Sequence, residues 1–434
     1  MQTQFTLAQL ADRALAESDK ILRACVHCGF CTATCPTYVV LGDERDSPRG
    51  RIYMIKNMLE GGKAADPATV THIDRCLTCL SCMTTCPAGV DYMHLVDNAR
   101  AHIARTYERP FFDRLMRSAL NAILPHPRRF ALALGLGALA RPFRNFFGKQ
   151  LRALFNLLPR EQQSARKLNS STFPATGVPP KKVALLDGCV QPVLRPQIND
   201  SAIRLLNRRG VVVVTPKDSG CCGALSHHLS KQQDALRFVK ANIDVWMREI
   251  EGSGLDAILV TASGCGTMIK DYEHMFANDA EYAERARHVS SLARDISEFV
   301  AEIGLGEADK AQPLKIAYHS ACSLQHGQSV SEQPRRLLCD AGFDVREVAE
   351  GHLCCGSAGI YNILEPEISS QLLARKARNI ERTGAQAIAT GNIGCITQIG
   401  RGTKLPIVHT VELLDWATGG PIPAELSAAC ARSA

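Results

Sequence analysis

Two closely similar cysteine-rich strings lie near the N-terminus, Cys25-Val-His-Cys28-Gly-Phe-Cys31-Thr-Ala-Thr-Cys35-Pro36 and Cys76-Leu-Thr-Cys79-Leu-Ser-Cys82-Met-Thr-Thr-Cys86-Pro87. Both read C-x2-C-x2-C-x3-C-P, so one cysteine spacing is written twice in the first fifth of the chain. Three thiols two residues apart can surround one face of a metal cluster on a short loop, and the fourth leaves on a turn that ends in proline. The N-terminal part is therefore predicted to fold around metal.

This spacing is typical of the loops by which bacterial ferredoxins hold two [4Fe–4S] clusters, with the fourth cysteine of each run bound to the neighbouring cluster. By that rule cluster 1 is predicted to be held by Cys25, Cys28, Cys31 and Cys86, and cluster 2 by Cys76, Cys79, Cys82 and Cys35. A structural zinc site would need two C-x2-C pairs and would leave the third cysteine of each run and the Cys-Pro unexplained. We therefore predict an electron carrier.

A second cysteine pattern is repeated further along the chain: Cys189, Cys221, Cys222 and Cys265, then Cys322, Cys354, Cys355 and Cys395. The first interval is 32 residues in both copies and the second is 43 in one and 40 in the other, and each vicinal pair is followed by glycine. Repetition at a fixed offset indicates duplicated structural units, here called the two modules. Of the eighteen cysteines only Cys339 and Cys430 remain, and we interpret them as filler or tail residues.

The modules have the sequence pattern of an α/β fold. Strands are predicted over 183–187, 211–214 and 257–260 in the first module and over 315–318, 345–348 and 387–389 in the second, with helices such as 231–250 between them. The cysteines follow the carboxyl ends of these strands, where open α/β sheets place ligands. Four thiols could therefore meet around iron–sulfur or zinc in each module. The alternative is reduced cysteines kept for packing, or a redox-sensitive vicinal pair.

The fold class predicted is α+β and multidomain. Helical spacing over 5–24 and over 48–61, where a compact ferredoxin has hairpins, indicates the helical variety of two-cluster domain. The predicted division is 1–108 for the helical ferredoxin-type domain, 109–182 for a basic amphipathic connector that ends in a linker at about 160–182, 183–310 for the first module and 311–434 for the second.

The connector concentrates positive charge, with fourteen Lys and Arg against two acids between Arg109 and Lys182, whereas the whole chain carries a net charge of +7. Arginines interleaved with Phe and Leu suit an anionic membrane surface or an acidic partner. The alternative is a connector whose apolar residues pack on the domains. No nucleic-acid module accompanies the charge, so nucleic acid is not an expected partner. The longest apolar run, Phe130 to Ala140, is too short to span a membrane.

Flavin and nicotinamide binding are not expected on this chain. Gly135-Leu-Gly137-Ala-Leu-Ala140 matches G-x-G-x-x-A, but Arg141-Pro142 would break the helix that should follow. The histidines near module cysteines, His227, His228, His319 and His352, are interpreted as structural or exposed. Cysteines grouped as metal motifs, with no N-terminal apolar leader, favour a reducing, cytoplasmic compartment over secretion.

Four local strings resemble the iron–sulfur subunits of glycolate oxidase in wording as well as spacing: Arg23–Tyr38, Pro48–Tyr53, Thr261–Gly266 and His352–Gly359. The resemblance covers essentially the whole chain. It implies a complex, peripheral on the inner face of the cell membrane, in which FAD-containing subunits oxidise glycolate to glyoxylate. This chain would carry the electrons towards a quinone-linked acceptor of the respiratory chain, and by itself would not oxidise glycolate.

One departure from the wider superfamily bears on the role of the modules. Its heterodisulfide reductase members end each module in C-x-x-C, whereas Cys265 and Cys395 stand alone here. Two classes of function stay open. The chain is either an electron relay or, as in related lactate, glycerol-3-phosphate or heterodisulfide oxidoreductases, a subunit whose modules reduce a disulfide or quinone themselves. The missing cysteines favour the relay.

Overall fold

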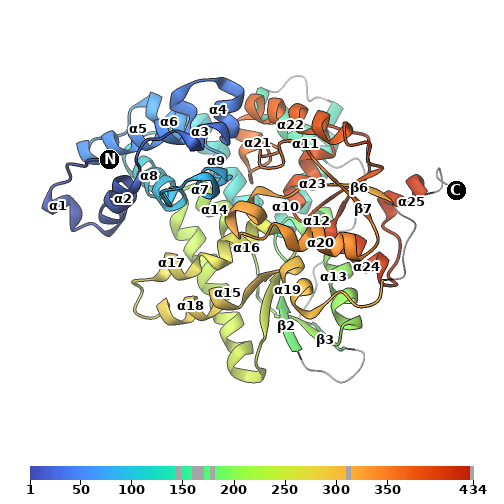
Figure 1. Ribbon diagram of the computed structural model, residues 1–434. Coiled ribbons are helices and arrows are strands. Elements are labelled where there is room, and N and C mark those ends of the chain that lie inside the picture. The colour runs from blue at the N-terminus through green and yellow to red at the C-terminus, as the bar shows by residue number, and fades with distance from the viewer. Residues whose placement is uncertain (143–147, 159–170, 176–180, 309–313, 431–434) are drawn as a thin grey trace.

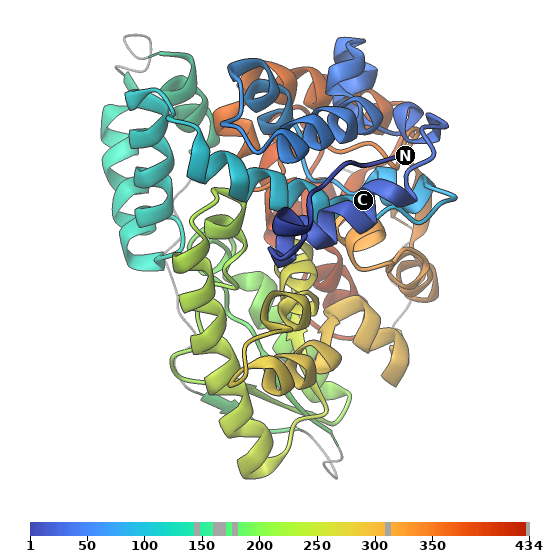
Figure 2. The same ribbon diagram turned by 90° about the vertical axis from the view of Figure 1, so that its left-hand side faces the viewer.

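The computed structural model describes residues 1–142, 148–158, 171–175, 181–308 and 314–430. An N-terminal helical domain (blue) lies beside two α/β modules (green to yellow, and orange to red), as Figure 1 shows. Three connector helices (teal) stand at one side of the molecule next to the N-terminal domain (Figure 2). The predicted α+β multidomain class is confirmed.

The N-terminal domain is built from short helices around the two cysteine runs: α1 (Leu7–Leu10), α2 (Arg13–Ala24), α3 (Phe30–Ala33), α4 (Pro36–Leu41), η1 (Glu44–Asp46), α5 (Pro48–Gly61), α6 (Pro67–Asp74), α7 (Ser81–Thr85) and α8 (Tyr92–Thr106). Its core packs Leu22, Ile55, Ile73 and Leu95, each fully buried. The helix predicted over 5–24 is two helices, because Asp12 caps a new one by accepting a hydrogen bond from the Leu15 amide.

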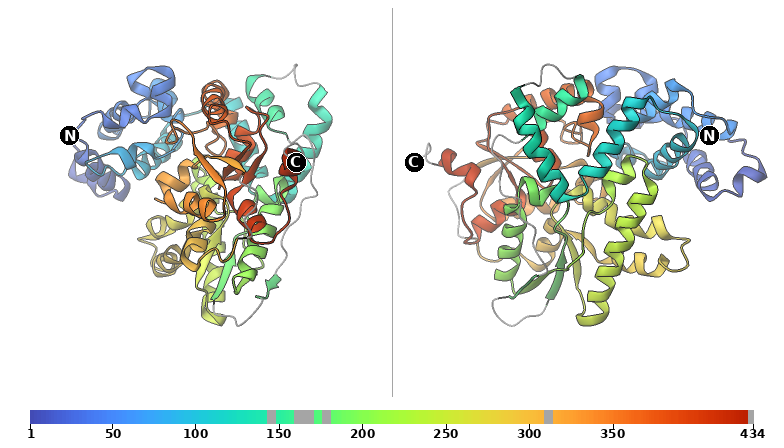
Figure 3. Two further views of the ribbon diagram at one scale, coloured as in Figure 1. Left: turned by 45° about the vertical axis from the view of Figure 1, so that its right-hand side comes forward. Right: turned by 180° about the vertical axis from the view of Figure 1, so that it is seen from behind.

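The connector forms α9 (Phe111–Ile123), α10 (Pro127–Ala140) and α11 (Lys149–Leu157). Leu120 and Phe130 are buried, whereas Phe112 and Leu139 are more than three-quarters exposed. Some apolar residues of the connector therefore pack on the domains, whereas others face outward. Seen from behind, the teal helices lie over the two modules (Figure 3, right).

The first module contains a five-stranded sheet in the order β1-β3-β2-β4-β5, and the second a four-stranded sheet in the order β7-β6-β8-β9. The strands are β1 (Ser171–Phe173), β2 (Lys181–Leu185), β3 (Val211–Thr215), β4 (Ala257–Val260), β5 (Ala293–Asp295), β6 (Lys315–Tyr318), β7 (Asp344–Glu347), β8 (Ala387–Thr390) and β9 (Ile407–His409). All pairs are parallel except β1 with β3. The order β3-β2-β4-β5 repeats as β7-β6-β8-β9, so the duplication seen in the cysteines extends to the whole sheet.

Helices cover both faces of the sheets. The helical segments of the first module are α12 (Gln191–Leu194), α13 (Gln197–Arg208), α14 (Ala224–His228), α15 (Gln232–Ser253), α16 (Ser263–Lys270), α17 (Tyr272–Phe276), α18 (Ala283–Leu292) and α19 (Ile296–Ile303). Those of the second are η3 (Ser323–Gly327), α20 (Glu332–Asp340), α21 (Tyr361–Leu364), α22 (Pro366–Glu381), α23 (Ile393–Ile399), α24 (Thr410–Ala417) and α25 (Ala424–Cys430). One continuous hydrophobic core contains residues of both modules, from Val183 to Leu426.

The structure departs from the sequence expectations at two places in the modules. Most of the linker predicted over 160–182 lies outside the described residues, but Ser171–Phe173 within it form β1, which pairs with β3. The strands β5 and β9, three residues each, are absent from the prediction. They complete a four-stranded parallel unit in each module.

Candidate metal centres

The two N-terminal cysteine loops have the same backbone shape. His27 and Gly29 in the first loop have φ of 56° and 87°, and Thr78 and Leu80 in the second have φ of 51° and 62°. Left-handed residues on both sides of the second cysteine turn each loop tightly, and a non-glycine residue there stores strain that usually marks a functional site. Helices α3 and α7 follow and carry the third cysteine of each run. One loop geometry thus repeats, as the shared spacing predicts.

The first four predicted ligands line one small cavity, namely Cys25, Cys28, Cys31 and Cys86, with Cys82 also at its wall. Cys28 is exposed, and its neighbours Val26 and Phe30 are 69% and 63% exposed. Burial and the nearby Cys25 raise the pKa of Cys31 to about 11. The thiolate form of this cysteine is therefore unfavourable unless a bound metal cation offsets its negative charge. Cys86, distant in sequence, joins the first loop rather than its own.

The second set lies deeper. Burial raises the pKa of Cys79 and Cys82 well above the ordinary value, and the nearby thiols that add to this include Cys35 for both. Cys35 therefore lies with the second run, and its sulfur is 3.8 Å from Nη1 of Arg51. The structure brings the predicted donors together in two groups of four. Three buried thiols and the half-buried Cys79, with no disulfide among the described cysteines, fit the donor set of a [4Fe–4S] cluster.

Two arginines that the sequence analysis missed stand beside the second set. Arg51, 1% exposed, donates to the His72 carbonyl at 2.7 Å and pairs with Asp46 at 3.3 Å. Arg100 donates to the Cys76 carbonyl at 2.7 Å. Burial raises the pKa of Cys76, but the two guanidinium groups lower it by more, so the pKa of this thiol lies below its ordinary value. Their position inside the site depends on tertiary packing, which spacing alone does not reveal.

In the modules, the glycine after each cysteine pair is required by the backbone. Gly223 and Gly356 have φ of 91° and 88°. A Cβ on Gly356 would lie 2.7 Å from the Ser369 carbonyl oxygen, and one on Gly223 would lie 3.1 Å from that of Ala235. The amides of Gly223 and Gly356 donate to Cys221 and Cys354 respectively, both at 3.4 Å. The glycine of the Cys-Cys-Gly motif therefore allows the cysteine pair of both modules to adopt the same backbone conformation.

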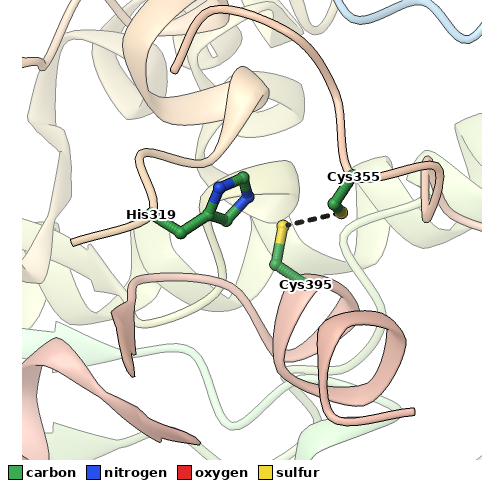
Figure 4. A group of neighbouring side chains, drawn as sticks. All are labelled: His319, Cys355 and Cys395. Atoms are coloured by element: carbon green, nitrogen blue, oxygen red, sulfur yellow. Dashed lines mark hydrogen bonds between the residues drawn. The ribbon is translucent and has the colours of Figure 1, made fainter. Parts of the chain in front are cut away.

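Each module gathers its four cysteines at the carboxyl edge of its sheet. Hydrogen bonds from Cys189 and Cys222 lower the pKa of Cys221, and the same hydrogen bonds together with burial raise the pKa of Cys189 and Cys222. The second module repeats this pattern. Hydrogen bonds from Cys322 and Cys355 lower the pKa of Cys354. The sulfur atoms of Cys355 and Cys395 are 3.7 Å apart (Figure 4).

A single large cavity joins these groups. It has a volume of about 1320 Å³, and its walls include all eight module cysteines together with Cys76 and Cys79. Residues of α9, α10 and α11, such as Leu120, Phe130 and Leu154, form its apolar side. Among the charges that raise the pKa of Cys79, Cys354 is the largest, so the second N-terminal set and the second module are neighbours. Sequence reasoning predicted the separate sets but not this shared space.

Of the histidines near the module cysteines, one lies inside a cysteine set. His319 is 1% exposed, and its ring nitrogens have no hydrogen-bond partner among the described residues. Its ligand atom and those of Cys355 and Cys395 all lie within 4.8 Å of one another. The interpretation of His319 as merely structural does not account for this position. The sequence signal that could have indicated a ligand role for His319 is its position three residues before Cys322.

These centres define an iron–sulfur protein with a duplicated cysteine-rich domain. The family description "4Fe-4S dicluster domain" matches residues 21–90, and "Cysteine-rich domain" matches 183–270 and 316–400. The chain is 41% identical over 421 residues to the glycolate oxidase iron-sulfur subunit of Escherichia coli K12, covering 96% of this chain and 99% of that one. The chain belongs to the family of glycolate oxidase iron–sulfur subunits, as the sequence resemblance indicated.

More distant relatives share parts of this arrangement. A probable glycolate oxidase iron-sulfur subunit of Bacillus subtilis 168 is 31% identical over 444 residues, which is 96% of this chain and 99% of that one. Lactate utilization protein A 1 of Bacillus anthracis is 28% identical over 243 residues, which is 54% of this chain and 97% of that one. A crystal structure of a hypothetical protein from Helicobacter pylori has the same fold, with a TM-score of 0.55 and 11% identity over 96% of this chain and 74% of that one.

Proposed function

We propose that this chain carries electrons from the flavin subunits of a glycolate-oxidising complex to a quinone-linked acceptor at the inner face of the cell membrane. The observation that carries the proposal is the placement of the two N-terminal cysteine sets, one at the surface and one facing the large cavity. The clusters that these cysteines would hold supply one-electron transfer at potentials set by their surroundings. The substrate pocket would lie on the partner.

The surface around Cys28 supports the docking of a partner. Val26, Phe30 and Tyr53 are each more than half exposed next to the first cysteine set. Apolar and aromatic side chains clustered at the surface are typical of the core of a protein–protein interface. The flavin-containing subunit is the partner that must approach this set, because electrons leave a flavin for the nearest redox group.

The opposite end of the relay is supported by the cavity and its connector wall. Phe112 and Leu115 of α9 line the cavity and are also 79% and 53% exposed, so the cavity is continuous with an apolar surface. On α10, Leu132, Leu136 and Leu139 face outward. Apolar helices flanked by arginine suit the interface of an anionic membrane. Among the described residues, no helix is long and apolar enough to cross a membrane.

Replacing Cys79 tests the relay in the assembled complex. We expect Cys79→Ala to remove one of four ligands from the second set, so glycolate still reduces the partner flavin while electron flow to an external acceptor falls at least about 100-fold. Flavin bleaching and acceptor reduction are measured in the same anaerobic sample.

Cys339→Ala is the matched control, because Cys339 is exposed and belongs to neither cysteine pattern. It should leave both rates unchanged. If Cys79→Ala also abolished flavin reduction in a fully assembled complex, the chain would act in substrate oxidation and the relay would be wrong. An unchanged acceptor rate would equally remove the second set from the path.

A further inference from the structure

His319 occupies a position where a buried imidazole should have a partner. It follows β6, whose last residue is Tyr318, and its ring points towards Cys355 and Cys395 (Figure 4). Burying a polar nitrogen without a hydrogen bond is destabilising, because the nitrogen gives up its hydrogen bonds to water. Both ring nitrogens lack a partner among the described residues, so the fold leaves room here for a group that the protein itself does not provide.

The spacing of the donors distinguishes a single ion from a cluster. Two thiolates bound to one tetrahedral zinc ion, each at about 2.3 Å, stand about 3.8 Å apart. The sulfur atoms of Cys355 and Cys395 are 3.7 Å apart. In a [4Fe–4S] cluster each cysteine binds a different iron, which spreads the thiolates further. The donor distances in the second module therefore suit one ion.

The first module lacks the histidine, although its cysteines have the same spacing. Leu186 stands three residues before Cys189, where His319 precedes Cys322. The two positions are structurally equivalent, because the amide of Leu186 donates to the Leu259 carbonyl of β4 at 3.0 Å and that of His319 to the Ala389 carbonyl of β8 at 2.9 Å. The duplicated modules have thus diverged at the residue that would complete a mixed sulfur and nitrogen site.

We propose that the second module binds one zinc ion through His319, Cys355 and Cys395, with the fourth ligand from the adjacent pair Cys322 and Cys354. Three thiolates with one imidazole form a common structural zinc set. This site goes beyond the electron relay, because zinc has no redox chemistry and the relay depends on the N-terminal cysteines.

A buried lysine balances the charge of the proposed site. Three thiolates and one Zn²⁺ leave a net charge of −1, which is costly in a protein interior. Lys376 is 2% exposed, donates to the Glu350 carbonyl at 2.8 Å and lies close enough to Cys322, Cys354 and Cys355 to interact with their charges. The first module has Ile243 at the same distance after its cysteine pair. Lys376 and His319 therefore both belong to the second module, whereas the first module has apolar residues at the two equivalent positions.

Metal analysis of the chain purified without oxygen tests the proposal. We expect about one zinc ion per chain besides the irons of the N-terminal sets, and X-ray absorption at the zinc edge should show three sulfur ligands and one nitrogen. His319→Ala should weaken zinc binding at least about 100-fold with the iron content unchanged, and an unchanged circular dichroism spectrum would show that the second module is folded. His319→Cys should retain zinc with four sulfur ligands.

His352→Ala is the matched control, because this histidine belongs to the same module but not to the group around Cys355 and Cys395. It should keep its zinc. Zinc retained in His319→Ala would overturn the role of His319. Absence of zinc in the wild type, with iron in the second module instead, would overturn the choice of metal. Neither result bears on the electron relay, which the Cys79→Ala measurement tests separately.

Discussion

At the residue scale, the environment of Arg51 separates the two N-terminal cysteine sets. Its guanidinium is buried between Asp46, Thr37 and Cys35, whereas Arg49, near the first set, is 36% exposed and paired with Glu44. A buried positive charge stabilises an added electron nearby far more than an exposed one does, because water screens the exposed charge. The second set should therefore hold its cluster at the higher potential.

Replacing Arg51 should change one potential selectively. We expect Arg51→Met to lower the midpoint potential of the second cluster by about 50–100 mV, equivalent to about 1–2 kcal/mol for one electron, while Arg51→Lys, which keeps the charge, changes it less. Redox titration followed by electron paramagnetic resonance gives both potentials. Arg49→Met is the control and should leave the second cluster unchanged. An identical second potential in Arg51→Met would show that the guanidinium does not act on it.

At the scale of elements, α10 is unusual in being apolar on two sides. Phe130 and Leu134 line the cavity, while Leu132, Leu136 and Leu139 are 65%, 59% and 76% exposed. A helix that is apolar all round is normally buried. The outward apolar face is therefore expected to contact another surface, and the arginines at both ends of the helix favour an anionic lipid surface.

Polar substitution of this face tests the membrane contact. We expect the triple variant with Gln at Leu132, Leu136 and Leu139 to bind anionic phospholipid vesicles at least about 100-fold more weakly, since each buried leucine contributes about 1–2 kcal/mol. Vesicle co-sedimentation at several salt concentrations measures this. Leu7→Gln, which changes an exposed leucine of the N-terminal domain, should bind as the wild type does. Equal binding by the triple variant would show that α10 does not contact lipid.

The elements also show what the sequence could and could not predict. The strands expected over 257–260 and 315–318 coincide with β4 and β6, because fully buried parallel strands are continuous apolar runs. The strands β5 and β9 were missed since three residues give no periodicity. Cysteine spacing predicted the members of each donor set, because each spacing is repeated in a second copy of its motif. The shared cavity and the selection of His319 depend on loops meeting in space, so spacing could not reveal them.

At the scale of the whole molecule, a histidine network joins the N-terminal domain to the first module. His94 of α8 contacts Asp271 at 2.9 Å and Asp91 at 2.5 Å, and its ring stacks on His274 at 3.5 Å. His274 in turn contacts Glu17 at 2.6 Å. Burial lowers the pKa of His94, but Asp271 and Asp91 raise it more, to about 10. The junction therefore contains a histidine that stays protonated at neutral pH.

The stability of this junction should depend on pH. Because the pKa of His94 is raised from 6.5 to about 10 on folding, its contribution is complete below pH 6.5 and is lost as pH rises towards 10. We expect His94→Gln to destabilise the protein by about 1–3 kcal/mol near pH 6.5 and by progressively less above pH 8. Melting temperatures at pH 6.5, 8 and 9.5 check this. His102→Gln, on the same helix but bonded to the Lys63 carbonyl at 3.1 Å rather than to a carboxylate, is the control, and a difference that did not vary with pH would contradict the assignment.

The large cavity has a consequence for the order in which the protein is made. The cysteines of both N-terminal sets are complete once Cys86 has been synthesised, whereas the walls of the cavity extend from Asp74 to Thr397. The iron ligands of the N-terminal sets are thus complete while most of the chain has still to be synthesised. The donors of the second module come together only near the end of translation. The N-terminal donors are thus complete long before those of the second module, and the cavity is enclosed only once its last wall residues, such as Thr397, have been made.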